Sequence, residues 1–439
     1  MSNGKAQTGF LEKTFKLSEN KTNVKTEIIA GITSFMTMAY ILAVNPDLLS
    51  AAGMDKGGVF TATALSAAIA TLIMAFYANY PFVLAPGMGL NAFFAFTVCG
   101  IMGYSWQFAL TAVFIEGIIF ILMSFVNVRE AIVNAIPMNL KNAVSAGIGL
   151  FIAFLGFQSA GIIVGDPATL VKLGDLTQPA AIVTILGVII TGILLHKKVK
   201  GAMLIGILAS TIIAIPLGVT KLPSSFISMP PSLASVAFKL DFSNIFSLDM
   251  LIVIFTFLFV DVFDTIGTLV GVASKADMLD ENGTLPRVKP ALFADAVGTT
   301  AGALLGTSTV TTFVESASGV SEGGRTGLTA LTSAILFLLA LFLAPIFGII
   351  PGAATAPALI LVGLSMMSSV LKVDFDDYTE AIPAFLAIIM MPIAYSIAEG
   401  IVFGMVSYAV LKLIAGRGKE VSPVVYILSV LFILKYIFL

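Results

Sequence analysis

Cysteine and histidine are nearly absent from this chain of 439 residues, which contains one of each, Cys99 and His196. A single cysteine excludes an internal disulfide and any metal cluster built from several cysteines. The single histidine lies in the basic run HKKVK (196–200), so neither a structural metal site nor a serine–histidine–aspartate catalytic set is expected. We therefore expect no metal ion and no cofactor, and we do not expect an enzyme.

Charged residues are also scarce. They make up 11% of the chain, whereas soluble domains carry roughly 25%. Hydrophobic residues make up 58%, and the mean hydropathy is +1.04. No single soluble core buries this much apolar surface, so lipid must be the solvent for much of it. The composition predicts an all-α polytopic membrane protein, and the net charge of −2 argues against nucleic acid as a partner.

Apolar stretches of about 20 residues, long enough to cross a bilayer, recur along the chain and give about 14 transmembrane segments. The first seven spans are expected at residues 27–45, 59–79, 83–98, 105–126, 141–164, 179–196 and 201–219. The second seven spans are expected at residues 249–272, 290–305, 308–320, 326–349, 355–371, 381–396 and 399–415. The C-terminal segment 416–439 includes a last apolar stretch, 424–439, which either adds a span or lies along the interface.

The distribution of basic residues predicts the orientation. The polar N-terminal tail, residues 1–26, lacks the apolar core of a signal peptide and is expected in the cytoplasm. Most lysines and arginines, such as Lys197 and Lys198, then fall on the cytoplasmic side, and few, such as Lys56 and Lys172, fall outside. We expect a multi-pass protein of the cell membrane with a cytoplasmic N-terminus.

The two halves of the chain resemble each other. GYSWQFALTAV (103–113) aligns with GGRTGLTALTS (323–333), and Gly149 matches Gly363. Seven spans in each unit would invert the second unit relative to the first, which is the plan of many secondary transporters. The two repeats are expected at residues 27–219 and 249–415.

Two spans in matching positions, 83–98 and 308–320, are too short and too rich in glycine or threonine to cross as regular helices. The first contains Pro86, Gly87 and Gly89, which disfavour a continuous helix. Backbone groups freed in this way cannot face lipid, so they must line a protein cavity, where they can bind a solute. The alternative is a close helix–helix contact that needs small residues, and both interpretations can hold together.

Acidic and amide side chains inside apolar spans are the candidate functional residues, because a charge at bilayer depth costs at least a few kcal/mol. Asp261 and Asp264 lie three residues apart in FLFVDVFDTIGTLVG and share one helix face. Glu315 lies in the second broken span, in STVTTFVESASG, and Asn91 lies in the first. A structural hydrogen bond or ion pair is the alternative for a single acid, but no mid-span lysine or arginine is evident to neutralise three. The pattern predicts a site for a proton or a polar solute.

Four motifs cover most of this evidence: GITSFMTMAYILAVNP (31–46), APGMGLNAFFAFTV (85–98), FVDVFDTIGTLVG (259–271) and TSTVTTFVESASGVSEGGRTGLTAL (307–331). With them the chain resembles the AzgA-type purine permeases of the nucleobase–cation symporter superfamily, over residues 22–418. The resemblance implies two inverted seven-span repeats and short strand-like breaks in spans 3 and 10 that meet at the substrate. It also implies a core domain of spans 1–4 and 8–11 and a gate domain of spans 5–7 and 12–14.

The resemblance also implies roles for individual residues. Glu315 matches a glutamate that hydrogen-bonds the base, and Asn91 and Phe94 match positions beside it. Asp261 and Asp264 match acids needed for binding and transport. Which of the two aspartates touches the base and which carries the proton stays open.

The resemblance implies import of purine nucleobases by proton symport, with guanine and hypoxanthine favoured. One carboxylate can accept two parallel N–H bonds from the edge of guanine. An adenine-preferring permease of the same family is an alternative, and so is an anion transporter or channel on the same fold, although three buried acids count against an anion. The ranking of the three bases, coupling to protons rather than sodium, and a homodimer are left open.

Overall fold

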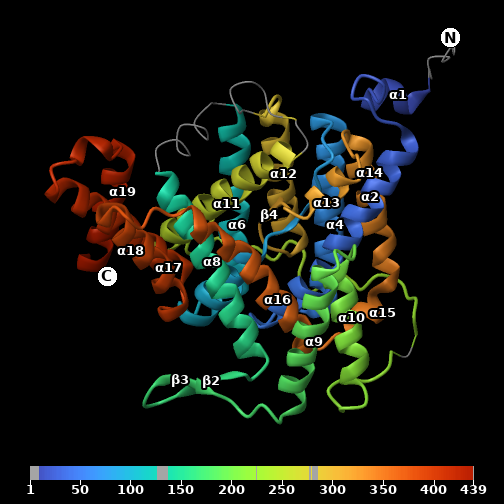
Figure 1. Ribbon diagram of the computed structural model, residues 1–439, viewed down its shortest axis with the longest axis horizontal. Helices are drawn as coiled ribbons and strands as arrows, with labels where there is room; N and C mark the ends of the chain where they lie inside the picture. Colours follow the sequence, from blue (N-terminus) through green and yellow to red (C-terminus); the bar gives the residue numbers. More distant parts are fainter. Residues whose placement is uncertain (1–8, 126–136, 224, 276–277, 279–284, 439) are drawn as a thin grey trace.

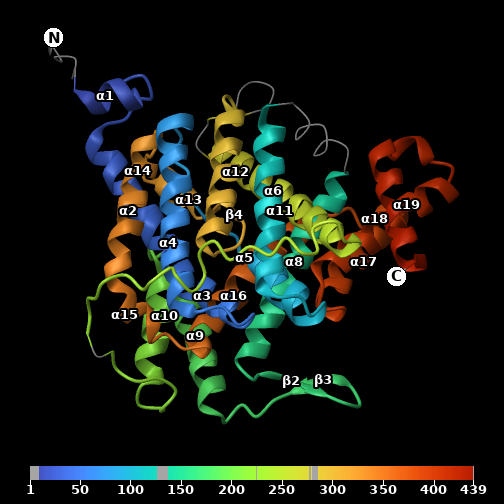
Figure 2. The same cartoon turned by 180° about the vertical axis from the view of Figure 1, so that it is seen from behind.

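The computed structural model describes residues 9–125, 137–223, 225–275, 278 and 285–438. This part of the chain is mostly helical, and α1 and the hairpin β2–β3 lie at opposite ends of the helical body (Figure 1 and, from behind, Figure 2). Seven of the described helices are long and apolar enough to cross a membrane, and further apolar helices are shorter. The prediction of an all-α polytopic membrane protein is confirmed.

The expected spans fall on helices, or on strands continued by helices, in both halves. The first half contains α1 (Phe10–Phe15), α2 (Val24–Met38), α3 (Ile41–Ser50), α4 (Lys56–Ile73), the π-helix η1 (Met74–Ala78), β1 (Leu84–Pro86), α5 (Met88–Ala92), the π-helix η2 (Phe93–Ile101), α6 (Trp106–Phe125), α8 (Met138–Ser159), β2 (Ile163–Asp166), β3 (Leu170–Leu173), α9 (Pro179–His196) and α10 (Ala202–Ala214). The second half contains α11 (Leu248–Lys275), α12 (Val288–Leu305), β4 (Val310–Thr312), α13 (Ser316–Ser321), α14 (Gly327–Ala340), the 3₁₀-helix η3 (Leu341–Leu343), α15 (Ala344–Gly348), α16 (Gly352–Met367), the 3₁₀-helix η4 (Ser368–Lys372), α17 (Tyr378–Ile393), α18 (Ile397–Ile414), the 3₁₀-helix η5 (Gly418–Glu420) and α19 (Pro423–Phe438).

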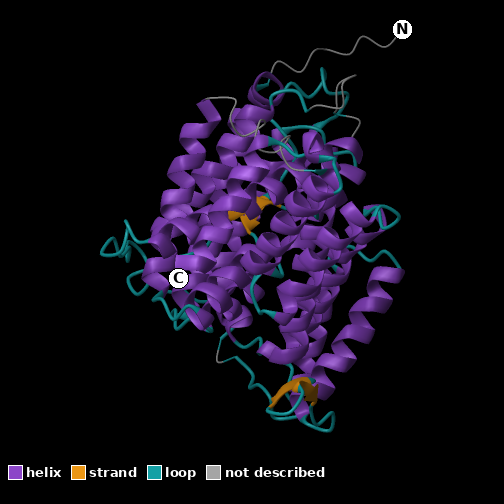
Figure 3. Cartoon of the chain, turned by 90° about the vertical axis from the view of Figure 1, so that its left-hand side faces the viewer, coloured by secondary structure: helices purple, strands orange, loops and turns teal. Residues whose placement is uncertain are grey.

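The predicted breaks in spans 3 and 10 are short strands that pair with each other. β1 and β4 are antiparallel, with Ala85 opposite Thr311, and the pair lies inside the helical body (Figure 3). Each strand is three residues long and fully buried. The pairing satisfies backbone groups that neither span could satisfy alone at this depth.

Span 1, one helix from Val24 to Ser50, has an irregular turn at Ala39 and Tyr40 that was not predicted from the sequence. α2 ends at Met38 and α3 begins at Ile41, so that Tyr40 lies at the junction. The chain tightens there into a bond from the Ala43 N–H to the Tyr40 carbonyl at 3.0 Å. Pro46 follows inside α3 and lacks the N–H that a regular helix would use.

Segments that match between the halves meet each other in space. α8 and α16 pack together, and a Cβ placed on Gly149 would lie only 2.6 Å from the carbonyl oxygen of Gly363. The two glycines identified as equivalent in the sequence are therefore in contact, as β1 and β4 are. Contacts between equivalent segments are what an inverted repeat produces near its axis.

The helices pack in two groups. α8 packs on α16 and α17, and α9 packs on α10 and α16, whereas α12 packs on α4 and α6, and α14 packs on α2 and α4. The predicted gate domain would correspond to the first of these groups, and the predicted core domain would correspond to the second.

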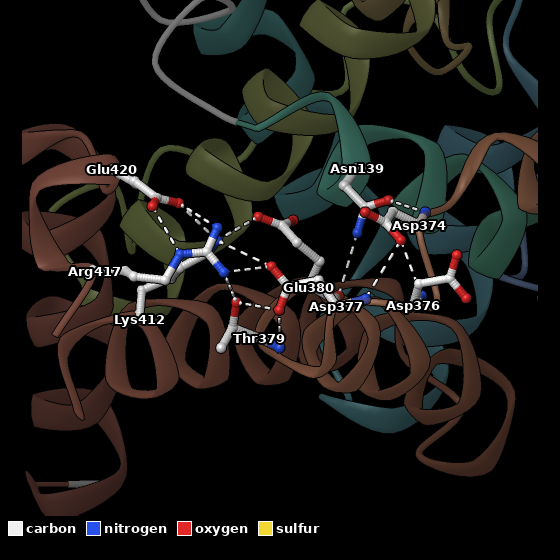
Figure 4. Close-up of polar contacts among 9 residues, drawn as sticks. All are labelled: Asn139, Asp374, Asp376, Asp377, Thr379, Glu380, Lys412, Arg417 and Glu420. Atoms are coloured by element: carbon white, nitrogen blue, oxygen red, sulfur yellow. Dashed lines mark hydrogen bonds and ion pairs between the residues drawn. The ribbon is translucent and has the colours of Figure 1, made fainter. Parts of the chain in front are cut away.

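A network of charged side chains ties the ends of α17 and α18 to η5 (Figure 4). Lys412 is fully buried and lies 2.8 Å from Glu380 and 2.9 Å from Glu420. Arg417 bonds Glu420 and Asp377. The Arg417 guanidinium, followed by the Lys412 ammonium, lowers the pKa of Glu420 to about 2, and Arg417 also holds the pKa of Asp377 below its usual value.

Candidate functional site

Two of the predicted acids lie beside the strand pair. Glu315 follows β4, and Asp264 projects from α11; both carboxyl-bearing residues are half-buried. A Cβ on Gly87, just after β1, would lie 3.7 Å from Asp264 Oδ2. Asp264 also lies close enough to Glu315 and Asp295 for their charges to interact. The fold thus brings acids from spans 8, 9 and 10 to the point where spans 3 and 10 are broken.

Glu315 is held by a side chain from span 1. The hydroxyl of Tyr40 donates to Glu315 Oε1 at 2.6 Å. Among the described residues, neither Glu315 nor Asp264 forms an ion pair with a lysine or arginine. These two acids therefore differ from the ion-paired carboxylates of the α17–α18 network.

Asp261 lies deeper, in a cluster centred on the hydroxyl of Thr265. Thr265 Oγ1 is 2.9 Å from Asp261 Oδ1, 2.9 Å from Asp295 Oδ1 and 2.7 Å from Thr311 Oγ1. A hydroxyl has one hydrogen to donate and two lone pairs, so two of these three neighbours must donate to Thr265. Only one of them is a hydroxyl. All three contacts can be hydrogen bonds only if at least one of the two carboxyl groups carries a proton.

Asn91 links the two broken spans. It is fully buried, its Oδ1 accepts a hydrogen bond from the hydroxyl of Ser308, and its Nδ2 lies 3.5 Å from the Pro86 carbonyl oxygen. Phe94, the fifth predicted residue, is fully buried on η2. The structure thus places the ring of Phe94 in the protein interior, whereas Asn91 fastens the strand of span 10 to the helix after β1.

Two buried acids near the site were not among the predicted residues. Asp295 lies on α12, and Glu116 lies on α6, where its Oε2 accepts a bond from Thr309 at 2.7 Å. An acid inside an apolar span is the same signal that selected Asp261. That signal was present in FADAVG, and it could have found Asp295.

Another buried acid has a structural role. Glu27, in the first turn of α2, accepts bonds from the backbone N–H groups of Arg325, Thr326 and Thr329 and from the Thr329 hydroxyl at 2.6 Å. These donors satisfy its carboxylate and fix the turn between α13 and α14. A buried acid in this fold is therefore not functional by burial alone.

Paired broken spans from two inverted halves, with acids gathered beside them, are typical of a membrane transporter. The chain belongs to the Permease family (Xan_ur_permease), whose model matches residues 25–403. It is 48% identical to the guanine/hypoxanthine permease PbuG of Bacillus subtilis, over 97% of this chain and 99% of that one. It is 46% identical to the adenine permease AdeP of Escherichia coli, over 98% and 97% of the two chains. These relatives are transporters and not enzymes, as expected.

A solved structure shares the fold. The transmembrane domain of a cyanobacterium bicarbonate transporter, BicA, superposes with a TM-score of 0.66, covering 87% of this chain and 97% of that one at 17% identity. At this identity the similarity concerns the architecture alone. It supports the prediction of about 14 spans in two inverted repeats.

Proposed function

We propose that this protein imports purine nucleobases by proton symport, with guanine and hypoxanthine favoured. The observation that carries the proposal is the position of Glu315 and Asp264, two half-buried carboxyl groups beside the β1–β4 pair that are not neutralised by a described lysine or arginine. A planar neutral base with N–H groups on its edge satisfies such acceptors without bringing a counter-charge. Asn91 supports the site by holding the two broken spans together.

The Thr265 cluster is the proposed place of the coupled proton. Asp261 and Asp295 share the one hydroxyl of Thr265, and the hydrogen-bond count favours a proton on one of them. A proton held next to the base site links the two transported species. The proton gradient and, where net charge moves, the membrane potential then drive uptake.

An adenine-preferring transporter is the second candidate. The chain is nearly as similar to an adenine permease, at 46% identity, as to a guanine/hypoxanthine permease, at 48%. Uptake of radiolabelled guanine, hypoxanthine and adenine into proteoliposomes, with and without an imposed pH gradient, ranks the substrates. We expect accumulation of guanine and hypoxanthine that needs the gradient; accumulation of adenine alone would support the second candidate.

The role of Glu315 is tested by E315A. Removing the charged acceptor of a hydrogen bond from the base should cost about 1.5–3 kcal/mol of binding, so uptake of radiolabelled hypoxanthine should fall about ten- to a hundredfold. The control is Glu19→Ala, which removes an exposed carboxylate from the N-terminal segment and should leave uptake unchanged. Normal uptake by E315A, with the protein in the membrane, contradicts the assignment of Glu315.

Competition separates the base transporter from an anion transporter on the same fold. We expect unlabelled guanine to compete with labelled hypoxanthine, and we expect sulfate and bicarbonate not to compete. Competition by the anions, with none by guanine, would reject a purine site.

A further inference from the structure

Span 1 supplies a side chain to the site through a motif that the proposed function leaves without a role, GITSFMTMAYILAVNP (31–46). Tyr40 lies at the irregular turn between α2 and α3 and is only 1% exposed. A buried tyrosine hydroxyl needs a hydrogen-bond partner, and that of Tyr40 is Glu315 Oε1, at 2.6 Å. Span 1 therefore brings this hydroxyl to the acid that is proposed to bind the base.

A second residue of this motif contacts the chain at the other end of the span 10 strand. Asn45, which is fully buried on α3, donates from Nδ2 to the hydroxyls of Thr307 at 2.8 Å and Thr63 at 2.7 Å. Thr307 comes before β4, and Glu315 comes after it. Tyr40 and Asn45 thus connect the residues before and after β4 to span 1. These hydrogen bonds fix the position of Glu315 relative to the β1–β4 pair.

The contact with Tyr40 makes the two oxygens of Glu315 unequal. Oε1 accepts the hydrogen bond from the phenol, so a proton on this carboxyl would sit on Oε2. Among the described residues, no side chain other than that of Tyr40 hydrogen-bonds the Glu315 carboxyl, and Glu315 keeps partial exposure. The oxygen that remains for a ligand is therefore Oε2.

We infer that Tyr40 is a positioning residue for base recognition: it holds Oε1 of Glu315, so that Oε2 is presented to an N–H group of the purine. The inference rests on the proposed function, in which Glu315 binds the base. Tyr40 acts through Glu315 and does not itself touch the base. Its loss should therefore weaken base binding, while the steps that carry the loaded site across the membrane are preserved.

The test is Y40F, which removes the hydroxyl and keeps the ring. For hypoxanthine uptake into proteoliposomes, we expect KM to rise about tenfold, with the maximal rate changed by less than about twofold, because a hydrogen bond to a charged group is lost. Y104F is the matched control: the Tyr104 hydroxyl also donates to a carboxylate, Asp249, in the first turn of α11, about four helical turns before Asp264. Its KM should stay at the wild-type value.

A second pair of variants tests whether Tyr40 acts through Glu315. In E315D the carboxylate is one methylene shorter and withdraws from the phenol, so adding Y40F should change the affinity for labelled hypoxanthine by less than about twofold. Y40H keeps a ring with an N–H donor, and its KM should lie between those of wild type and Y40F. It also serves as the test variant if Y40F does not fold.

The possible failures are distinguishable. A wild-type KM in Y40F, or full effects of Y40F on top of E315D, overturns the positioning role of Tyr40 while the base site stands. Normal uptake in E315A overturns the base site itself. An equal loss in Y40F and Y104F would indicate a general structural effect and would also reject the inference.

Discussion

At the scale of single residues, the hydroxyl of Thr265 is the most restrictive feature of the site. Three oxygen atoms lie 2.7–2.9 Å from it. All three contacts can be hydrogen bonds only if a carboxyl group is protonated, because a hydroxyl has one hydrogen to donate. Because Asp295 lies opposite Asp261, a proton on this pair would be shared by two helices, α11 and α12. Asp264 lies instead next to Gly87, beside the β1–β4 pair.

D295N tests the shared proton. The amide keeps the shape of the carboxyl and donates permanently to Thr265, so it imitates the protonated state. We expect exchange of labelled hypoxanthine for unlabelled hypoxanthine across the membrane to persist, while accumulation driven by an imposed pH gradient falls at least tenfold. Accumulation at the wild-type level in D295N would exclude Asp295 as the carrier of the coupled proton.

Some of the site residues were predicted from the sequence and others were missed, for a physical reason. Asp261, Asp264, Glu315 and Asn91 were predicted because polar groups are rare in apolar spans, and the structure places them around the strand pair. Tyr40 was not predicted as a site residue, because a tyrosine in an apolar span is ordinary and its contact with Glu315 is seen only in the folded protein. Polarity can be read along a chain, whereas the direction of a side chain depends on tertiary packing.

At the scale of elements, small residues decide how closely helices approach. The breaks in spans 3 and 10 were predictable from length and composition, because proline and glycine cluster in one and threonine in the other. The contact between Gly149 and Gly363 could not be derived in the same way. Their equivalence was visible in the sequence, but their meeting at the α8–α16 crossing follows from the inverted packing of two halves.

G363A tests this crossing. A Cβ at this position meets the Gly149 carbonyl oxygen and Ala153, so the helices must separate; such overpacking costs typically 1–3 kcal/mol. We expect a lower melting temperature in detergent for G363A. The matched control is G192A on α9, where an added Cβ has no neighbour within 4 Å and the melting temperature should be unchanged or higher. Equal melting temperatures for the two variants would show that α8 and α16 tolerate separation.

At the scale of the whole molecule, an ion pair between described residues joins the two groups of helices. Lys200, in the turn between α9 and α10, lies 2.6 Å from Glu322 at the end of α13, with side-chain exposures of 51% and 29%. Helices on both sides of this pair must separate if the predicted gate and core domains move relative to each other during transport. Because an exposed pair contributes about 0–1 kcal/mol, it can bias that movement without locking it.

Reversing the charge of Lys200 tests whether this ion pair biases the movement of the two predicted domains. K200E should change the rate of hypoxanthine exchange by up to about fivefold, and the double variant K200E/E322K should restore it. The control is K198E, which reverses a neighbouring charge outside this ion pair and should have a smaller effect. If K200E and K198E behave alike, or the double variant is not restored, the ion pair has no part in the movement.

The β1–β4 pair has a consequence for biosynthesis. Ala85 and its partner Thr311 are separated by 226 positions in the chain, and ribosomes add roughly 5–20 residues per second. After the first strand emerges, about 11–45 s therefore pass before the second is made. During that time the backbone groups of Ala85 that later face Thr311 need a temporary shield from the lipid tails, which the translocon or an associated insertase would have to supply, whereas those of Leu84 already have the Thr71 hydroxyl of α4 as a partner.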